Sequence, residues 1–251
     1  MEPLIIVIGL GLLGILLGIF GAIIGSTLLI LVPLFNFIGL PMHVALGSAK
    51  TSQLGRELVP IFVFNKNKLI DFKLAIPFII TGAIFSIIGT YIVFNLSEKT
   101  LSTIVGIFMV VISLIIFFKP NLGMHEKKIK KSKKTLIYSL VLGSLVGLYV
   151  GVFGGGVNVL IITTFVAVFG NNFLKAVANS KFPNFIFGLI SSIFFIAKGY
   201  INWYYTLPIL ITTPIGAYFG AKLAIQKGNK FIRAIFVGLV IVMAIKLIFF
   251  N

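Results

Sequence analysis

The sequence predicts an all-α polytopic membrane protein made of two homologous repeats, each with about four to five helical segments and with helices broken at glycines. Three observations lead to this prediction. Of the 251 residues, 59% are hydrophobic and 10% are charged, whereas a soluble domain carries about 25% charged residues. The mean hydropathy is +1.17, and the apolar residues gather in long segments. Finally, the second half repeats features of the first at a constant spacing.

The apolar segments give the expected order of elements. A helix needs about 20 residues to cross ~30 Å of hydrocarbon, and most of the segments reach that length. They cover 4–35, 42–64, 72–95 and 100–118 in the first half, and 135–169, 173–197, 201–221 and 231–250 in the second.

A basic stretch separates the two sets of segments. We therefore expect a first transmembrane repeat over 1–118, a basic cytoplasmic linker over 119–134 and a second transmembrane repeat over 135–251. Lysines at the cytoplasmic face favour anionic lipid as the partner of this linker, rather than nucleic acid.

The first and fifth segments are too long for one ordinary crossing, and both are interrupted by glycines. Each is expected to form two short helices that meet at a break, as in many transporters. The glycines expected at these breaks are Gly21 and Gly25 in the first half and Gly154, Gly155 and Gly156 in the second.

A gapless shift of 131 residues brings the two halves into register. It superimposes Lys50 on Lys181, two cations inside apolar segments. We interpret the match as a duplication, because the aligned residues include glycines and prolines, which have special backbone conformations. They include Gly25 and Gly156, Gly39 and Gly170, Pro77 and Pro208, and Gly89 and Gly220.

The loop charges favour inverted repeats over parallel ones. Cations accumulate on the cytoplasmic side of membrane proteins. If each long segment crosses once, the halves are parallel and six cations lie outside, against twelve inside. If each long segment turns back at its glycines, the halves are inverted and both termini lie outside. Only Lys99, Lys198 and Lys246 are then external, against fifteen cations inside.

The two aligned lysines define the candidate substrate site. A charge near the bilayer centre costs several kcal/mol and usually faces a cavity or a partner. Lys50 follows the expected start of its span by about eight residues, roughly 12 Å at 1.5 Å per residue. Inverted symmetry would bring Lys181 to the same depth. Neighbouring hydroxyls and amides that could bind oxyanion oxygens are Ser48, Thr51, Ser52, Gln53, Asn179, Ser180 and Asn184.

Structural roles remain open for these charged residues. Lys50 could extend to the membrane surface, or pair with Glu57 on the same helix face. Glu57 is the only acid well inside an apolar segment, which makes it a candidate for proton coupling. A structural ion pair of Glu57 with Arg56 or Lys50 is the alternative.

Several short motifs resemble the sulfite exporter TauE/SafE family of membrane anion transporters. Gly154-Gly155-Gly156 resembles the glycine run of that family, and Asp71-Phe72 and Asn202-Trp203 resemble its Asp-Trp turn. Where the family commonly has Thr-Ser, this chain has Ser48-Ala49 and Asn179-Ser180. The resemblance covers nearly the whole chain and implies transport of an anion such as a sulfur oxyanion. It does not extend to Lys50 and Lys181.

These features predict a multi-pass secondary transporter of the cell membrane. Its substrate would be a small anion such as sulfite or sulfoacetate, moved by alternating access, with protons as a candidate coupling ion. An anion channel and a non-transporting membrane scaffold or assembly factor are the alternatives. Without cysteines, and with two histidines and five acids, the chain shows no metal-ligand spacing or paired carboxylates. We therefore expect no enzyme activity and no cofactor.

Overall fold

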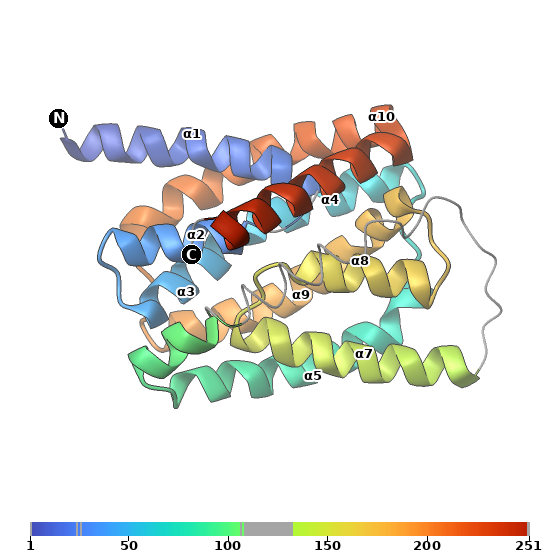
Figure 1. Cartoon of the computed structure of the whole chain (residues 1–251), viewed down its shortest axis with the longest axis horizontal. Coiled ribbons are helices and arrows are strands. Elements are labelled where there is room, and N and C mark those ends of the chain that lie inside the picture. The colour runs from blue at the N-terminus through green and yellow to red at the C-terminus, as the bar shows by residue number, and fades with distance from the viewer. Residues whose placement is uncertain (1, 24, 26, 106, 108–132, 250–251) are drawn as a thin grey trace.

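The computed structural model describes residues 2–23, 25, 27–105, 107 and 133–249, and every regular element in these ranges is a helix (Figure 1). The prediction of an all-α protein is therefore confirmed. Of the expected linker over 119–134, the described ranges include only Lys133 and Lys134, which begin a helix. The rest of that prediction lies outside the described residues.

The helices follow the apolar segments of the sequence. Residues 98–105 also form a helix, and α10 is interrupted at Gly228, where the backbone leaves the helical region. The named elements are α1 (Glu2–Ile23), α2 (Leu28–Phe37), α3 (Met42–Ser52), α4 (Leu54–Lys66), α5 (Phe72–Phe94), α7 (Lys133–Val152), α8 (Val157–Ala167), α9 (Phe173–Ala197) and α10 (Trp203–Phe249).

Within the described part of the chain, five helices are long and apolar enough to cross a membrane: α1, α5, α7, α9 and the part of α10 up to Gly228. Large apolar side chains such as Leu12, Ile80 and Leu145 lie exposed on their outer faces. Exposed apolar surface of this extent suits contact with lipid rather than with water. The helices α2 and α8 are apolar but shorter.

The short helices α2 and α8 turn back at the glycine breaks. In Figure 1, α1 begins at the left and α2 returns toward the left, whereas α7 begins at the right and α8 returns toward the right. Both turns use a glycine with positive φ, Gly25 at 80° and Gly156 at 76°. This left-handed conformation is strained for residues with a Cβ. The two hairpins therefore point in opposite directions, as expected for inverted halves.

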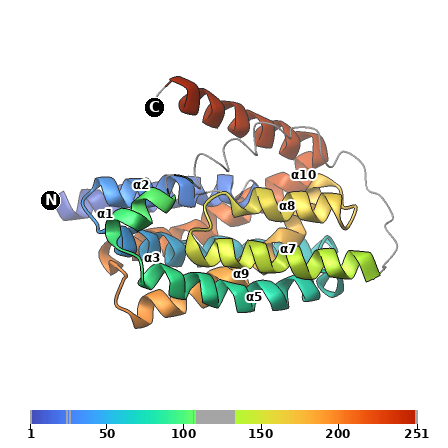
Figure 2. The ribbon, with the colours of Figure 1, turned by 60° about the horizontal axis from the view of Figure 1, so that its bottom comes forward.

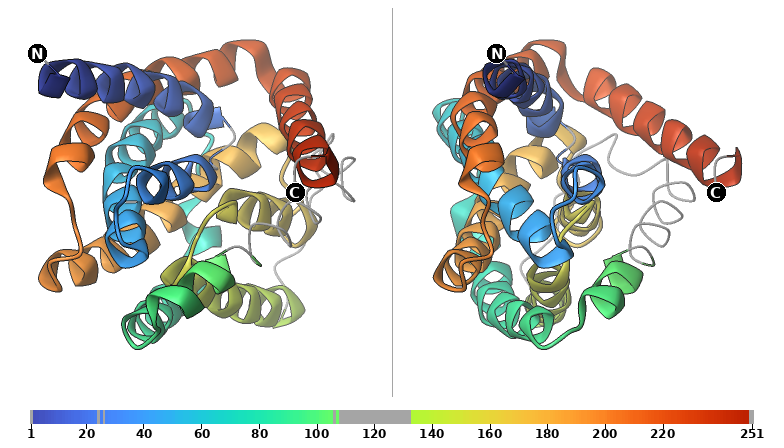
Figure 3. Two further views of the ribbon diagram at one scale, coloured as in Figure 1. Left: turned by 60° about the vertical axis from the view of Figure 1, so that its left-hand side comes forward. Right: turned by 90° about the vertical axis from the view of Figure 1, so that its left-hand side faces the viewer.

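Two pairs of parallel helices enclose the hairpins. Viewed along the long axis in Figure 3 (right), α1 and α10 lie at the top and α5 and α7 at the bottom. Glycines allow close approach within both pairs. A Cβ added to Gly151 of α7 would lie 2.7 Å from the Cα of Gly89 in α5, and one added to Gly18 of α1 would lie 2.8 Å from the amide nitrogen of Ala217 in α10. Small residues are the usual means of close helix packing in membranes.

The two ends of the bundle differ in charge. One end holds the start of α7, with Lys133 and Lys134, and the end of α4, with Lys66 as its last residue and Lys68 in the loop that follows (Figure 1). We call it the lysine-rich end. The other end holds the starts of α3 and α10, where the rings of His43 and Tyr200 lie 5.3 Å apart. By the positive-inside rule, we expect the lysine-rich end to face the cytoplasm.

Two helical segments of the structure differ from the segments expected from the sequence. The segment 42–64 forms two helices, α3 and α4, joined at Gln53, whereas its counterpart α9 is continuous even though it contains Pro183. Beyond Gly228, α10 turns back and its last part lies at the edge of the bundle (Figure 2). Gly228 has a φ of 71°, which ends a regular helix at that point.

Candidate functional site

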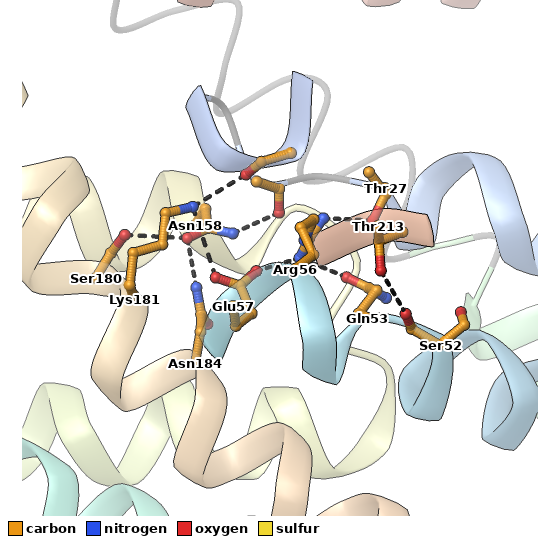
Figure 4. Close-up of polar contacts among 12 residues, drawn as sticks. Thr27, Ser52, Gln53, Arg56, Glu57, Asn158, Ser180, Lys181, Asn184 and Thr213 are labelled. Carbon is orange, nitrogen blue, oxygen red and sulfur yellow. Dashed lines mark hydrogen bonds and ion pairs between the residues drawn. The ribbon is translucent and has the colours of Figure 1, made fainter. Parts of the chain in front are cut away.

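The candidate site lies where the two glycine breaks meet, in the middle of the bundle. Asn158, the second residue of α8, donates a hydrogen bond from Nδ2 to the carbonyl oxygen of Gly25 (Figure 4). Its Oδ1 accepts hydrogen bonds from Asn184 and from the hydroxyl of Ser180, the latter at 3.1 Å. Asn158 therefore connects the α1–α2 break, α8 and α9.

Lys50 lies at this level and is only 4% exposed. Its ammonium group donates to the carbonyl oxygens of Val150 at 2.8 Å and Gly151 at 2.6 Å, and to the hydroxyl of Ser191 at 3.0 Å. The two carbonyls belong to the last turn of α7, where a helix leaves its carbonyls without internal partners. Lys50 therefore does not reach the membrane surface, and these groups rather than Glu57 hold its ammonium.

Lys181 makes the corresponding contact with the first hairpin. It is 1% exposed, and its ammonium donates to the carbonyl oxygen of Gly21 at 3.0 Å, near the end of α1. Its Nζ also lies 3.5 Å from Oε2 of Glu57. Each aligned lysine thus binds the end of the first helix of the opposite half, α7 for Lys50 and α1 for Lys181, which places a cation at the negative end of that helix.

Arg56 and Glu57 complete the charged cluster at the start of α4. Arg56 donates to Oε1 of Glu57, to the hydroxyl of Thr27, and to Oε1 of Gln53 at 2.6 Å. Its Nε has no hydrogen-bond partner among the described residues. The arginine side chain passes over Gly21, where a Cβ would lie 2.8 Å from Nη1. Both Arg56 and Glu57 are buried, at 2% and 4% exposure.

The cluster surrounds a small cavity of about 40 Å³. Of the ionisable groups named above, Lys50, Arg56 and Glu57 line it. Lys181 does not line the cavity, but it forms an ion pair with Glu57, which does. The N-termini of α2 and α8 border the cavity with Leu28 and Val157. A second hollow of about 390 Å³ lies between α7 and α8, but no charged group lines it.

Most of the predicted site residues line the cavity, contact its lining or belong to the turn into α8. Lys50, Gln53, Glu57, Asn184 and Gly154 line the cavity. Ser180, Lys181, Gly21 and Gly25 bind or adjoin residues that line it. Gly155 and Gly156 belong to the turn into α8, where Gly155 accepts from Tyr149.

The other predicted residues lie away from the cavity. Ser48 accepts from the backbone N–H of Asn202 at 2.9 Å, and Asn179 accepts from the backbone N–H of Asp71 at 2.8 Å. Ser52 donates to the carbonyl of Ala49 within its own helix. The hydroxyl of Thr51 is buried without a hydrogen-bond partner in the described part of the chain.

Sequence reasoning omitted Asn158 from the site and considered Arg56 only as a partner of Glu57. A signal for Asn158 was present, since it is an amide in an apolar segment two residues after a glycine break. A buried amide in a membrane needs hydrogen-bond partners. Such a residue next to a break marks a place where another element must approach.

Comparison with known proteins agrees with this architecture. The sequence model of the sulfite exporter TauE/SafE family matches residues 10–247. A probable membrane transporter protein of Haemophilus influenzae is 27% identical over 228 residues, covering 91% of this chain and 89% of the relative.

A bacterial and an archaeal relative are similar to the same extent. The probable membrane transporter protein YfcA of Escherichia coli K12 is 28% identical over 237 residues, with 93% and 86% of the two chains covered. A probable membrane transporter protein of Methanocaldococcus jannaschii is 28% identical over 237 residues, with 91% and 86% covered. No solved structure matches the chain.

Proposed function

Because the chain belongs to the sulfite exporter TauE/SafE family of membrane transporters, we propose that it is a secondary transporter of a small sulfur oxyanion such as sulfite. The observation that carries this proposal is the cluster of buried cations around a small cavity at the meeting point of two re-entrant hairpins. The family is one of transporters rather than enzymes, so the site is a binding site for a transported molecule.

The charge of the cluster favours an anion. Three basic side chains, Lys50, Arg56 and Lys181, lie around one acid, Glu57. Ionised groups inside a membrane are costly unless they are paired or functional. The N-termini of α2 and α8, which border the cavity, add partial positive charge from unpaired backbone N–H groups. Broken helices that point their N-termini at an anionic substrate are a recurring feature of transporters.

The size of the cavity favours a compact substrate. A water molecule needs about 10–15 Å³ when volume is measured in this way, so 40 Å³ holds roughly three waters. An anion of about four heavy atoms, such as sulfite, is of that size. Sulfoacetate would require the surrounding helices to move apart.

Alternating access is supported by the reciprocal contacts between the halves. Ser48 of the first half binds Asn202 of the second, and Asn179 of the second half binds Asp71 of the first. The shift of 131 aligns Ser48 with Asn179 and Asp71 with Asn202, so the two contacts are equivalent. Two halves that hold one another by equivalent contacts can exchange roles when they rock about a central site, as proposed for other transporters built from inverted repeats.

The test is uptake of radiolabelled sulfite by proteoliposomes that contain the purified protein. We expect saturable uptake in the wild type and a loss of at least ten-fold in kcat/KM for Lys50→Met, because the site loses one of the three cations that balance the charge of the anion, and a buried charge partner is worth about 2–5 kcal/mol. Methionine keeps the length of the side chain. Lys198→Met is the matched control, since Lys198 is exposed and lies over Phe94 outside the cavity.

Thermal unfolding in detergent completes the design. Sulfite, thiosulfate, sulfate, sulfoacetate and taurine would each be added to the wild type, and the substrate is expected to raise the melting temperature. A Lys50→Met protein that is folded and still takes up sulfite at the wild-type rate would contradict the proposed site. Current that rises with sulfite concentration without saturation would indicate a channel.

A further inference from the structure

Glu57 occupies a distinctive position in the charged cluster. It lies between cations from two different helices, with Oε1 bound to Arg56 of α4 and Oε2 lying 3.5 Å from Nζ of Lys181 in α9. The shift of 131 aligns Arg56 and Glu57 with Phe187 and Gly188. Only the first half therefore carries this acid–base pair, although each half carries one of the two aligned lysines.

Glu57 and Arg56 each have one polar atom that makes no hydrogen bond to the described residues. Oε2 of Glu57 and Nε of Arg56 are buried and have no hydrogen-bond partner within the described residues. Both side chains line the cavity. A buried polar atom without a partner is costly, so an oxyanion that accepts from Nε of Arg56 would supply a missing contact. Glu57 is then the group that competes with that oxyanion for the same cations.

The surroundings of Glu57 contain few other charges. From α3, Lys50 lines the same cavity, and from α9 the amide of Asn184 also does so. From α1, the carbonyl of Gly21 binds Lys181. The part of α10 that packs beside Gly55 presents Leu210 and Pro214, which carry no charge. Among the described groups, Arg56, Lys181 and Lys50 are thus the charges that face Glu57.

We infer that Glu57 couples anion transport to protons by acting as an internal counter-anion of Arg56 and Lys181. This inference rests on the proposed function. When its carboxylate binds a proton, Glu57 becomes neutral and releases the two cations to bind the substrate. When the proton leaves, the carboxylate takes the cations back and displaces the anion. One proton and one anion then cross together, and the transport of a monoanion is electroneutral.

The test uses proteoliposomes at a fixed external pH of about 7, with internal pH set at about 6, 7 or 8, and radiolabelled sulfite as the probe. A fixed external pH keeps the ionisation of external sulfite constant, and protein-free vesicles give the background. Because internal sulfite also changes its ionisation between these pH values, the accumulation ratio is calculated for the monoanion at each internal pH. At one proton per anion, each unit of pH difference changes the accumulation ratio about ten-fold. Exchange of external for internal sulfite at equal pH is measured in the same vesicles.

Glu57→Gln removes the charge and keeps the shape of the side chain. We expect this variant to exchange sulfite but to lose the dependence of accumulation on internal pH. Glu98→Gln is the matched control, because Glu98 is an exposed acid that binds His43 and does not line the cavity. It is expected to retain wild-type coupling.

The outcomes separate the inference from the function on which it rests. If the wild type neither takes up nor exchanges sulfite, the proposed function fails. If it exchanges sulfite but ignores the pH gradient, or if Glu57→Gln still accumulates sulfite with the gradient, coupling through Glu57 is wrong. A folded Glu57→Gln protein that has lost exchange as well would also overturn the inference.

A second measurement on the wild type covers the case in which Glu57→Gln does not fold. Carbodiimides modify protonated carboxyl groups in apolar surroundings, and mass spectrometry identifies the modified residue. We expect modification of Glu57 to increase as pH falls and to abolish gradient-driven accumulation. An unmodified Glu57 at about pH 5.5, in protein that carbodiimide inactivates, would overturn the inference.

Discussion

Replacing Gly21 by alanine tests the central packing of the site. Gly21 lies near the end of α1, and the side chain of Arg56 passes directly over it. A Cβ at this position would lie 2.8 Å from Nη1 and 3.0 Å from Nε of Arg56. The arginine cannot move away freely, because Thr27, Gln53 and Glu57 all accept hydrogen bonds from it.

The expected magnitude follows from two opposing effects. Alanine in place of glycine favours a helix by about 1 kcal/mol. Displacing Arg56 breaks at least one charge-assisted hydrogen bond, worth about 1.5–3 kcal/mol, and overpacking adds about 1–3 kcal/mol. We therefore expect Gly21→Ala to lower the free energy of unfolding by about 1.5–5 kcal/mol. The KM for sulfite should rise about ten-fold or more because Arg56 no longer faces the cavity.

Gly9→Ala provides the matched control on the same helix. Gly9 is exposed, and a Cβ there would meet nothing within 4 Å. The same substitution should therefore be neutral or stabilising by up to about 1 kcal/mol. Unfolding is measured by titration with SDS in mixed micelles, and transport in proteoliposomes. Equal effects of the two substitutions on stability, or normal sulfite transport by Gly21→Ala, would refute the packing described for Arg56.

Two further predictions concern Asn158 and Glu98. Asn158→Leu deprives the Gly25 carbonyl and the Asn184 amide of a partner and should cost about 1–3 kcal/mol in the same SDS titration. Thr164→Val is the control, because it loses only a hydrogen bond within α8, to the carbonyl of Leu160 at 2.8 Å. It should lower the free energy of unfolding by less than about 1 kcal/mol. Equal losses of stability in the two variants would contradict the role of Asn158. At the membrane face, Glu98 binds the His43 side chain and the N–H groups of Met42 and His43. Although burial alone raises the pKa of Glu98, these contacts hold the pKa below its ordinary value of 4.5. The carboxylate therefore adds stability above about pH 4.5 that is lost as pH falls through the lowered pKa. In thermal unfolding, the melting temperature of the wild type should exceed that of Glu98→Gln, and this difference should become smaller as the pH is lowered. A difference in melting temperature that does not change with pH would exclude this effect.

Much of the fold could be predicted from the sequence because its signals are local. A run of about 20 apolar residues is itself the condition for a membrane helix, and the described helices follow these runs. Gly25 and Gly156, expected at breaks, both adopt positive φ. Gly39 and Gly170, also 131 residues apart, do the same. Aligned glycines of the two halves thus share the same backbone conformation.

The partners of the buried charges could not be predicted in the same way. The sequence placed Lys50 and Lys181 inside the membrane, and symmetry suggested that both would face the substrate. In the structure, Lys50 binds the end of α7 and Lys181 binds the end of α1 and Glu57. These partners are backbone carbonyls, which every residue carries, so no residue type identifies them in advance. Their availability depends on where a helix ends.

The sequence by itself therefore determined that the chain crosses the membrane, that its helices break at two glycine-rich turns, and that two lysines lie within it. These properties depend on the residues of one segment and their burial in lipid. Only the tertiary structure decided that Asn158 joins the two breaks, that Arg56 passes over Gly21, and that Glu57 lies between two cations. Such contacts join residues far apart in the chain, and they arise because two hairpins of opposite direction meet at the centre of the bundle.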